Sequence, residues 1–158
     1  MSKAQINDLI SVEIPEGFHT MSEEELRQAY SDENPNRWGM WNKQRHAIVT
    51  VMWKEYPWLM KLLMPGLKAI CRNNEQLISK GYANNNYACG GFFSAEVDGE
   101  KAEGYRFNYR VGDEERSAET LLFRDDRTIY SLTCYGRSEN READRELFDG
   151  IIAGIKFL

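Results

Sequence analysis

The strongest constraint in this sequence is a run of four strand-like stretches in its second half, separated by very short turns. The stretches cover about 86–97, 104–111, 117–124 and 128–135, and Gly and Asp residues mark the reversals between them. Connections this short join only antiparallel neighbours, because a parallel pair needs a crossover of about a dozen residues or more. The sequence therefore predicts a meander of four antiparallel strands.

The first half adds one short helix and two strands. Ser22 and Glu25 have the spacing of a capping box, which predicts a helix over about 23–30. Aromatic and β-branched residues are frequent between Arg37 and Lys54, apart from a short polar interruption. This pattern favours two strands joined by a hairpin.

Two longer helices are predicted from apolar residues that recur at a spacing of 3.6. Pro65 interrupts an apolar run, so the first of them begins near Gly66, and Gly81 is placed to follow its last turn. The second covers about 139–155, with Ser138 as its cap. The predicted buried stripes are Leu67, Ile70, Cys71, Asn74, Leu77 and Ile78 in the first helix and Ala143, Leu147, Phe148, Ile151, Ile152 and Ile155 in the second.

The order of elements predicts the α+β class, with a single antiparallel β-sheet flanked by helices. The chain has 158 residues, which suits one domain, and we expect that domain to span residues 1–158. Apolar residues make up 42% and charged residues 28% of the sequence, which excludes a disordered polar tail.

Two short motifs connect this layout to a known family. An opening strand at Val12–Ile14 runs into the segment Ile-Pro-Glu-Gly-Phe at 14–18, and the last helix ends in Gly-Ile-Lys-Phe at 154–157. With the order of elements, these motifs resemble the Mog/PsbP-like superfamily, although Gly154 stands where a Ser is common in that pattern. The resemblance implies a three-layer α/β/α sandwich. It also implies action by binding, since members include a Ran-binding import factor, photosystem II accessory proteins and bacterial chaperones.

Charge and targeting signals narrow the possible partners and locations. The net charge is −5 and the sequence pI is near 5.2, which disfavours a protein whose main task is to bind nucleic acid. The N-terminal residues lack the apolar stretch of a secretory signal, and we expect a cytoplasmic protein without membrane insertion. The three cysteines, Cys71, Cys89 and Cys134, are then expected to be free thiols that pack as small apolar groups.

No motif for a metal, a cofactor or a phosphate group occurs in the sequence. His19 and His46 have no His, Cys or Asp at ligand spacing, and Gly90-Gly91 is not followed by the Lys or Ser/Thr of a phosphate loop. Carboxylates at 113–115 and 125–126 lie at predicted hairpin tips, where Asp serves turn geometry. We therefore expect no cofactor and no bound metal.

The most informative cluster combines tryptophan and methionine. All four Trp and five of the six Met lie between positions 21 and 64, within or close to a segment, 41–95, that carries seven basic and two acidic residues. Trp concentrates binding energy at interfaces and Met adapts to varied apolar partners, but both also fill cores. Both interpretations stay open. Pro57 and Pro65 favour a surface patch, because they should leave the residues between them as an irregular apolar segment near the surface. The candidate binding residues are Trp38, Met40, Trp41, Trp58 and Met60.

Two hypotheses of function follow. The leading one is a non-enzymatic binding, adaptor or chaperone-like module that recognises a protein or peptide segment through the Trp/Met residues. The alternative is a small-molecule binder or enzyme with a pocket between the sheet and the helices, in which His19, His46 and Arg106 are the candidate polar participants. The sequence does not indicate an oligomeric state.

Overall fold

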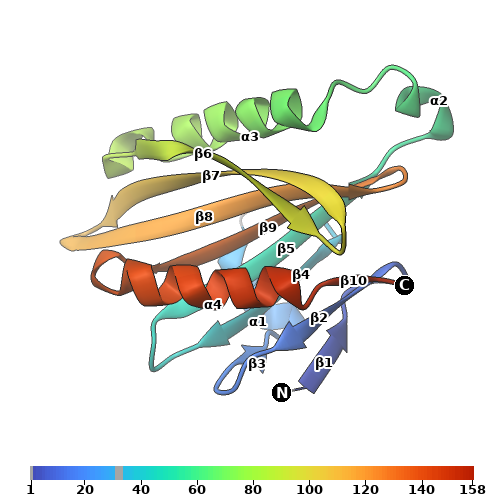
Figure 1. Ribbon diagram of the computed structural model, residues 1–158. Coiled ribbons are helices and arrows are strands. Elements are labelled where there is room, and N and C mark those ends of the chain that lie inside the picture. Colours follow the sequence, from blue (N-terminus) through green and yellow to red (C-terminus); the bar gives the residue numbers. More distant parts are fainter. Residues whose placement is uncertain (1, 31–33) are drawn as a thin grey trace.

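A seven-stranded antiparallel sheet runs through the middle of the molecule (Figure 1). The computed structural model describes residues 2–30 and 34–158. The order of the strands in this sheet is β3–β4–β5–β9–β8–β7–β6. Their bounds are β3 (His19–Thr20), β4 (Arg37–Asn42), β5 (Ala47–Glu55), β6 (Ala88–Val97), β7 (Glu100–Val111), β8 (Glu114–Asp125) and β9 (Thr128–Arg137).

The meander of the second half is confirmed; β7, β8 and β9 are somewhat longer than predicted, and β6 begins two residues later than predicted. Strands β6 to β9 pair consecutively, each antiparallel to the next. At the β6–β7 reversal, Asp98 and Gly99 both adopt positive φ angles of 48° and 85°. Asp and Gly tolerate this left-handed conformation, which matches the twist of a tight hairpin.

A second, smaller sheet was not predicted, so the expectation of a single sheet is wrong. It contains β1 (Ser2–Gln5), β2 (Ile10–Ile14) and β10 (Lys156–Phe157), with β2 in the centre. Both neighbours pair antiparallel with β2. The pairing of β10 with β2 joins segments that are far apart in the sequence, and turn residues predict pairing only between strands that are neighbours in the chain.

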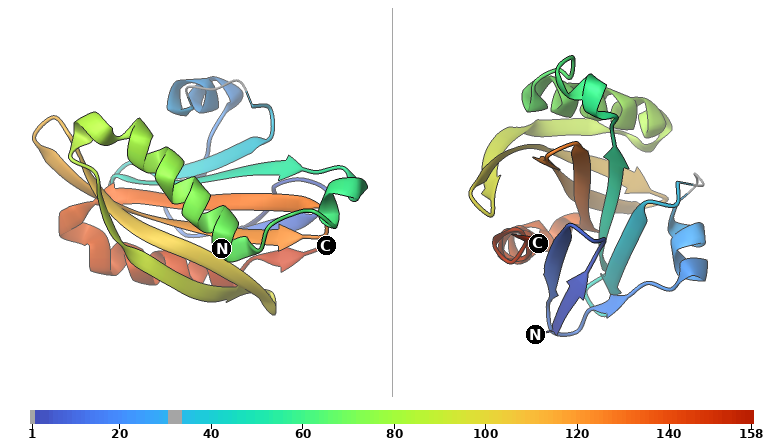
Figure 2. Two further views of the ribbon diagram at one scale, coloured as in Figure 1. Left: turned by 90° about the horizontal axis from the view of Figure 1, so that it is seen from above. Right: turned by 90° about the vertical axis from the view of Figure 1, so that its right-hand side faces the viewer.

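The helices lie on both faces of the large sheet, which confirms the α+β class and the three layers. α1 (Glu23–Ala29) and α3 (Leu67–Gly81) cover one face, while α4 (Arg141–Ala153) and the small sheet cover the other (Figure 2). The short helix α2 (Trp58–Lys61) connects β5 to α3, and two 3-10 turns, η1 (Ala83–Asn85) and η2 (Ser138–Asn140), precede β6 and α4.

The helix starts agree only partly with the predictions. At α1 the capping box is present, because Ser22 Oγ accepts from the Glu25 amide and Glu25 Oε1 accepts from the Ser22 amide. α3 begins after Gly66 as expected, but Gly81 is its last residue rather than the residue after it. Ser138 does not cap α4, since it begins η2 and Asn140 holds the cap position.

The sheet separates two apolar clusters. The first lies between the sheet, α4 and β2 and contains Phe148, Ile151, Ile152 and Ile155, as predicted for the last helix. The second lies under α3, with Cys71 packed on the aromatic residues of β7. Two predicted stripe positions are wrong: Ala143 is exposed and its neighbour Asp144 is buried, and Leu77 lies on the outer side of α3.

Candidate functional site

The structure separates the five predicted binding residues. Met40 is fully buried in the first apolar cluster, so this residue is excluded from any surface that we propose. Trp38, two residues away on β4, is partly buried against the same cluster. Trp41 points to the other face of the sheet because side chains alternate along a strand, and its ring centroid lies 4.4 Å from Lys43 Nζ.

The other two predicted residues belong to an exposed apolar stretch, which we call the α2 segment (residues 57–63). Exposed fractions are 65% for Trp58, 43% for Met60, 85% for Leu62 and 77% for Leu63, and Leu59 is exposed as well. Single exposed apolar residues are common on proteins, but a contiguous group of this size is typical of an interaction site.

Two prolines explain why this stretch stays outside the core. Pro57 follows β5 and occupies the N-cap of α2, and Pro65 prevents α2 from continuing into α3. The chain returns to the protein at Met64 and Leu67, which pack on the second apolar cluster. The α2 segment therefore lies on the surface between two anchored parts of the chain, the end of β5 and the packed residues Met64 and Leu67.

Polar contacts connect the α2 segment to the rest of the protein. Lys61 Nζ lies 2.6 Å from Asp126 Oδ1 in the β8–β9 turn, and the Lys61 ammonium lowers the pKa of this carboxyl group. On the same side, the Tyr56 amide donates to the Arg127 carbonyl oxygen at 2.9 Å. The segment thus lies beside the β8–β9 turn at one end of the sheet.

A groove between α1 and α3 leads toward the α2 segment, and we call it the α1–α3 groove. Its volume is about 290 Å³, and its walls include Tyr30, which follows α1, and Ile70 and Ile78 of α3. Hydroxyl groups of Thr50, Thr133 and Thr120 lie in register across β5, β9 and β8, and the last two share a hydrogen bond of 2.9 Å. Tyr56, which also lines the groove, directly precedes the α2 segment.

A smaller cavity lies on the opposite face, between the sheet and α4, and we call it the α4 pocket. Its volume is about 190 Å³. Glu119 Oε1 accepts hydrogen bonds from Arg106 Nε at 2.9 Å and from Arg145 Nε at 3.0 Å, which binds the pocket wall on β7 and β8 to α4. Arg45 pairs with Asp144 at 2.9 Å. Burial raises the pKa of Asp144, and the Arg45 charge opposes that shift.

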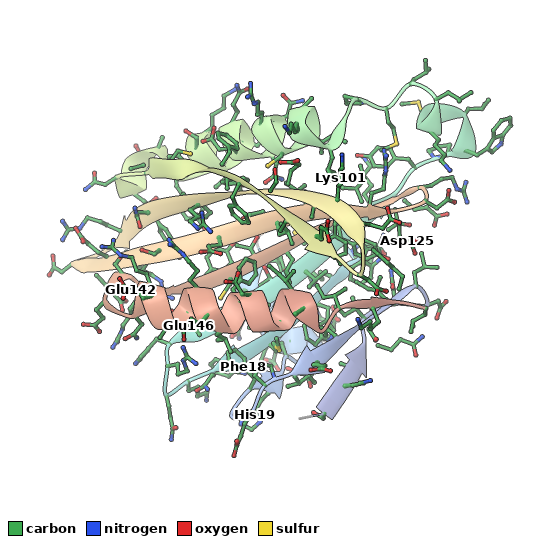
Figure 3. All side chains as sticks on the ribbon, viewed as in Figure 1. Phe18, His19, Lys101, Asp125, Glu142 and Glu146 are labelled. Atoms are coloured by element: carbon green, nitrogen blue, oxygen red, sulfur yellow. The ribbon has the colours of Figure 1, made fainter. Side chains whose placement is uncertain are left out.

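Of the three polar residues expected in such a pocket, Arg106 alone lines it. His19 is exposed on the short strand β3 and points away from the molecule (Figure 3). His46 is exposed in the β4–β5 turn, where its backbone oxygen accepts from Arg116 Nη2 at 3.3 Å. The expectation that the histidines contribute to this pocket is therefore wrong. Within residues 2–30 and 34–158, no three His, Cys, Asp or Glu side chains cluster as metal ligands do.

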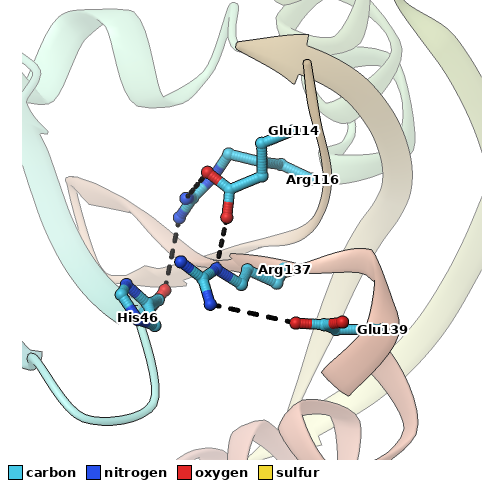
Figure 4. A network of polar contacts seen from close by, with 5 residues as sticks. All are labelled: His46, Glu114, Arg116, Arg137 and Glu139. Carbon is cyan, nitrogen blue, oxygen red and sulfur yellow. Dashed lines mark hydrogen bonds and ion pairs between the residues drawn. The ribbon is translucent and has the colours of Figure 1, made fainter. Parts of the chain in front are cut away.

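The carboxylates at the β7–β8 turn form ion pairs. Glu114 accepts a hydrogen bond from Arg137 Nε and lies 3.4 Å from Arg116 Nη1, and Arg137 also approaches Glu139 (Figure 4). These arginines hold the pKa of Glu114 below its usual range. A general acid at neutral pH needs a raised pKa, so this geometry is typical of a structural contact.

Solved structures show what this arrangement is similar to. No family model and no curated protein sequence matches the chain. A solution structure of cyanobacterial PsbP (CyanoP) from Synechocystis sp. PCC 6803 superposes with a TM-score of 0.70 at 11% identity, covering 94% of this chain and 86% of that one. The Ran-binding protein Mog1p of Saccharomyces cerevisiae gives a TM-score of 0.64 at 8% identity, with 98% and 94% covered.

This protein has the Mog/PsbP-like fold. LpqN of Mycobacterium tuberculosis, described as involved in cell envelope biogenesis, is more distantly similar, with a TM-score of 0.51, 12% identity, and coverage of 99% and 84%. At these identities the likeness concerns the fold. Among the described residues of this Mog/PsbP-like fold, no helix has the length and apolar character that a membrane span requires.

Within the Mog/PsbP-like fold, the α2 segment is the connection between β5 and α3. Residue type selected Trp58 and Met60 from the sequence but passed over Leu59, Leu62 and Leu63, which are also exposed. The pair of prolines predicted an irregular apolar segment near the surface that includes these leucines, because an apolar run between two helix breakers cannot form a regular buried element.

Proposed function

We propose that this protein is a non-enzymatic module that binds a protein or peptide segment through the α2 segment. The observation that carries the proposal is the exposure of five apolar side chains within six residues, from Trp58 to Leu63. Covering an exposed large apolar side chain gains roughly 1.5–3 kcal/mol, so a partner that encloses several of them gains substantial binding free energy.

The shape of the surface supports a segment-like partner. The α2 segment leads through Tyr56 into the α1–α3 groove, whose floor combines apolar side chains with the Thr and Ser hydroxyls of the sheet. A partner chain that covers the α2 segment can continue into this groove and form hydrogen bonds there. The similarity to Mog1p, a Ran-binding protein, is consistent with a protein as partner.

Basic side chains indicate the character of that partner. Lys54 and Lys68 are exposed on either side of the α2 segment, while Lys61 pairs with Asp126. We expect an apolar segment flanked by acidic residues, because opposite charges at an interface rim accelerate encounter and fix the register. We also propose the cytoplasm as the place of action, as the sequence suggested.

The test replaces the two most exposed leucines. Leu62→Ser combined with Leu63→Ser is expected to abolish capture of partners from the native cell extract, and a captured protein should bind the purified wild type at least about tenfold more tightly than the variant. Leu77→Ser is the matched control, because Leu77 is an exposed leucine in the C-terminal half of α3, outside the α2 segment. Equal binding by wild type and double variant would refute the proposal.

A second candidate function is the binding of a small molecule in the α4 pocket. Three arginines, Arg106, Arg141 and Arg145, line the pocket together with two carboxylates. Its volume of about 190 Å³ lies below the roughly 300–1,000 Å³ of typical ligand sites, which favours a small ligand. The three arginines outnumber the two carboxylates, which favours a ligand with negative charge. Thermal unfolding in the presence of small carboxylic acids tests this function, and the absence of any stabilisation that Arg106→Gln removes would reject it.

A further inference from the structure

One edge of the large sheet is long and open. β6 supplies ten residues to this edge, whereas β3 at the opposite edge supplies two. Most of β6 is exposed, and no residue in the described part of the chain pairs with its outer backbone groups. Unpaired N–H and C=O groups of this kind form a template for an additional strand.

The usual protections of a strand edge are mostly missing here. β6 contains no Lys and no Pro, and a bulge between Cys89 and Gly91 disturbs only its first part. From Phe92 to Val97 the strand pairs in regular register with β7. This regular half can accept a partner strand along its free side.

The side chains of this half alternate between two different surroundings. Phe92 faces α3, where the Arg72 guanidinium lies 6.0 Å from its ring centroid. Phe93 faces the other side, where the Arg106 guanidinium lies 4.2 Å from its ring centroid. Because alternation continues along the strand, Ser94 and Glu96 return to the α3 side.

The surface beside β6 on the α3 side is cationic. Lys68 and Arg72, one helical turn apart, are exposed and line a groove with Phe92 and Ser94, and neither forms an ion pair within the described residues. Lys101 lines the adjoining groove and is labelled in Figure 3. Glu96 and Glu103 offset part of this charge, so the five groups together carry a net charge of about +1.

We infer that an acidic, extended segment of a partner protein adds to β6 as an eighth strand of the large sheet. Its main chain bonds to the free edge between Phe92 and Val97, and its carboxylates at alternate positions face Lys68 and Arg72. The spacings agree, because alternate residues of a strand are about 6.6–6.8 Å apart and one helical turn rises about 5.4 Å. This surface does not include the α2 segment.

Charge argues against a second copy of this chain as the occupant. A two-fold axis that pairs two β6 edges antiparallel keeps both α3 helices on the same side of the joined sheet. Lys68 and Arg72 of one copy then approach the cationic side chains of the other. An acidic strand instead meets opposite charges along the same path.

The probe for this inference is a fluorescein-labelled decapeptide that alternates Glu and Val. We expect a saturable rise in fluorescence anisotropy with the wild-type protein, and slower amide exchange at residues 92–97 when the peptide is present. The combined substitution Lys68→Glu and Arg72→Glu should weaken binding about tenfold or more, because exposed charge pairs are replaced by repulsion. A Lys/Val peptide should show the reverse preference and bind this variant better than the wild type.

Two controls separate strand addition from simple charge attraction and from the proposed function. A Glu/Val peptide that is N-methylated at alternate amides keeps its charge but loses main-chain donors, so its binding should be lost. The Leu62→Ser and Leu63→Ser double variant should bind the Glu/Val peptide as the wild type does. The double substitution Lys68→Gln with Arg72→Gln is a milder variant that should also weaken binding of the Glu/Val peptide. Circular dichroism checks that this variant is folded.

Three outcomes would overturn the inference. The first is no binding of the Glu/Val peptide to the wild type, and the second is equal binding of its N-methylated form. The third is concentration-dependent dimerisation without peptide, accompanied by protection of the β6 amides, which would assign the edge to a second copy.

Discussion

Lys61 Nζ lies 2.6 Å from Asp126 Oδ1, and this ion pair joins the α2 segment to the β8–β9 turn. Both side chains are more than half exposed, so water and salt screen their attraction. We predict that Lys61→Ala changes the free energy of unfolding by less than about 1 kcal/mol while amide exchange in residues 58–63 becomes faster. A loss above about 2 kcal/mol in urea denaturation would show that the segment belongs to the core.

The same ion pair gives the α2 segment a pH dependence. The pKa of Asp126 is lowered by Lys61, so the folded state binds the proton of this carboxyl group less readily than the unfolded state. The stability that the Lys61–Asp126 pair contributes is fully present at pH values above the unfolded-state pKa of about 3.9. It is lost as the pH falls through the pKa of Asp126 in the folded state. Wild-type protection factors for residues 58–63 should then fall toward those of Lys61→Ala as the pH is lowered stepwise below about 3.9, and protection that stays unchanged until the protein unfolds would contradict this.

Met40 and Met60 form a matched pair of substitutions. Met40 has no exposed surface, and Met40→Ala should lower the free energy of unfolding by about 2–5 kcal/mol because it leaves a cavity in the first cluster. Met60→Ala should change it by less than about 0.5 kcal/mol, because Met60 is exposed on α2. Urea denaturation of both variants measures the difference, and comparable losses would remove the distinction between core and surface.

Gly104 and Gly150 give opposite predictions for the same change to alanine. A Cβ atom at Gly104 would lie 2.5 Å from both the Thr120 backbone oxygen and a Phe93 ring carbon, so Gly104→Ala should destabilise the fold by about 1–3 kcal/mol. Gly150 lies in α4 with open space around the same position, and Gly150→Ala should stabilise the fold by about 0.5–1 kcal/mol. Thermal unfolding followed by circular dichroism distinguishes the two signs.

The three thiols should differ in reactivity. Burial raises the pKa of Cys71 to about 11 and that of Cys134 to about 12, whereas Cys89 is exposed on β6. At pH 8 we expect a disulfide reagent to modify Cys89 alone in the folded protein and all three thiols in urea, because thiolates are the reactive form. Rapid modification of two or more thiols in the folded state would contradict the burial of Cys71 and Cys134.

Local signals predicted much of the fold. The capping box at Ser22 and Glu25, the four-stranded meander and the start of α3 all depend on residues close together in the sequence, and they occur as expected. The pairing of β10 with β2 depends on contacts between distant segments. Such contacts are decided by packing rather than by a local pattern, so the second sheet was missed.

The candidate site shows the same division. Trp58 and Met60 were identified by residue type, but residue type alone cannot decide between a core and a surface position, and Met40 is buried. Alternation along β4 separates Met40 from Trp41, but which face is covered depends on where α1 and α4 pack. The open edge at β6 likewise depends on the strand order, which turn residues do not specify at the two ends of a sheet.

The large sheet keeps the first and second apolar clusters on opposite faces, and among the described residues the two clusters share no member. Substitutions beneath α3 and beneath α4 should therefore have nearly additive effects on stability. Such independence lets one layer diversify in evolution while the other preserves the framework. A protein engineer could likewise recode the α3 side for a new target and leave the α4 side unchanged.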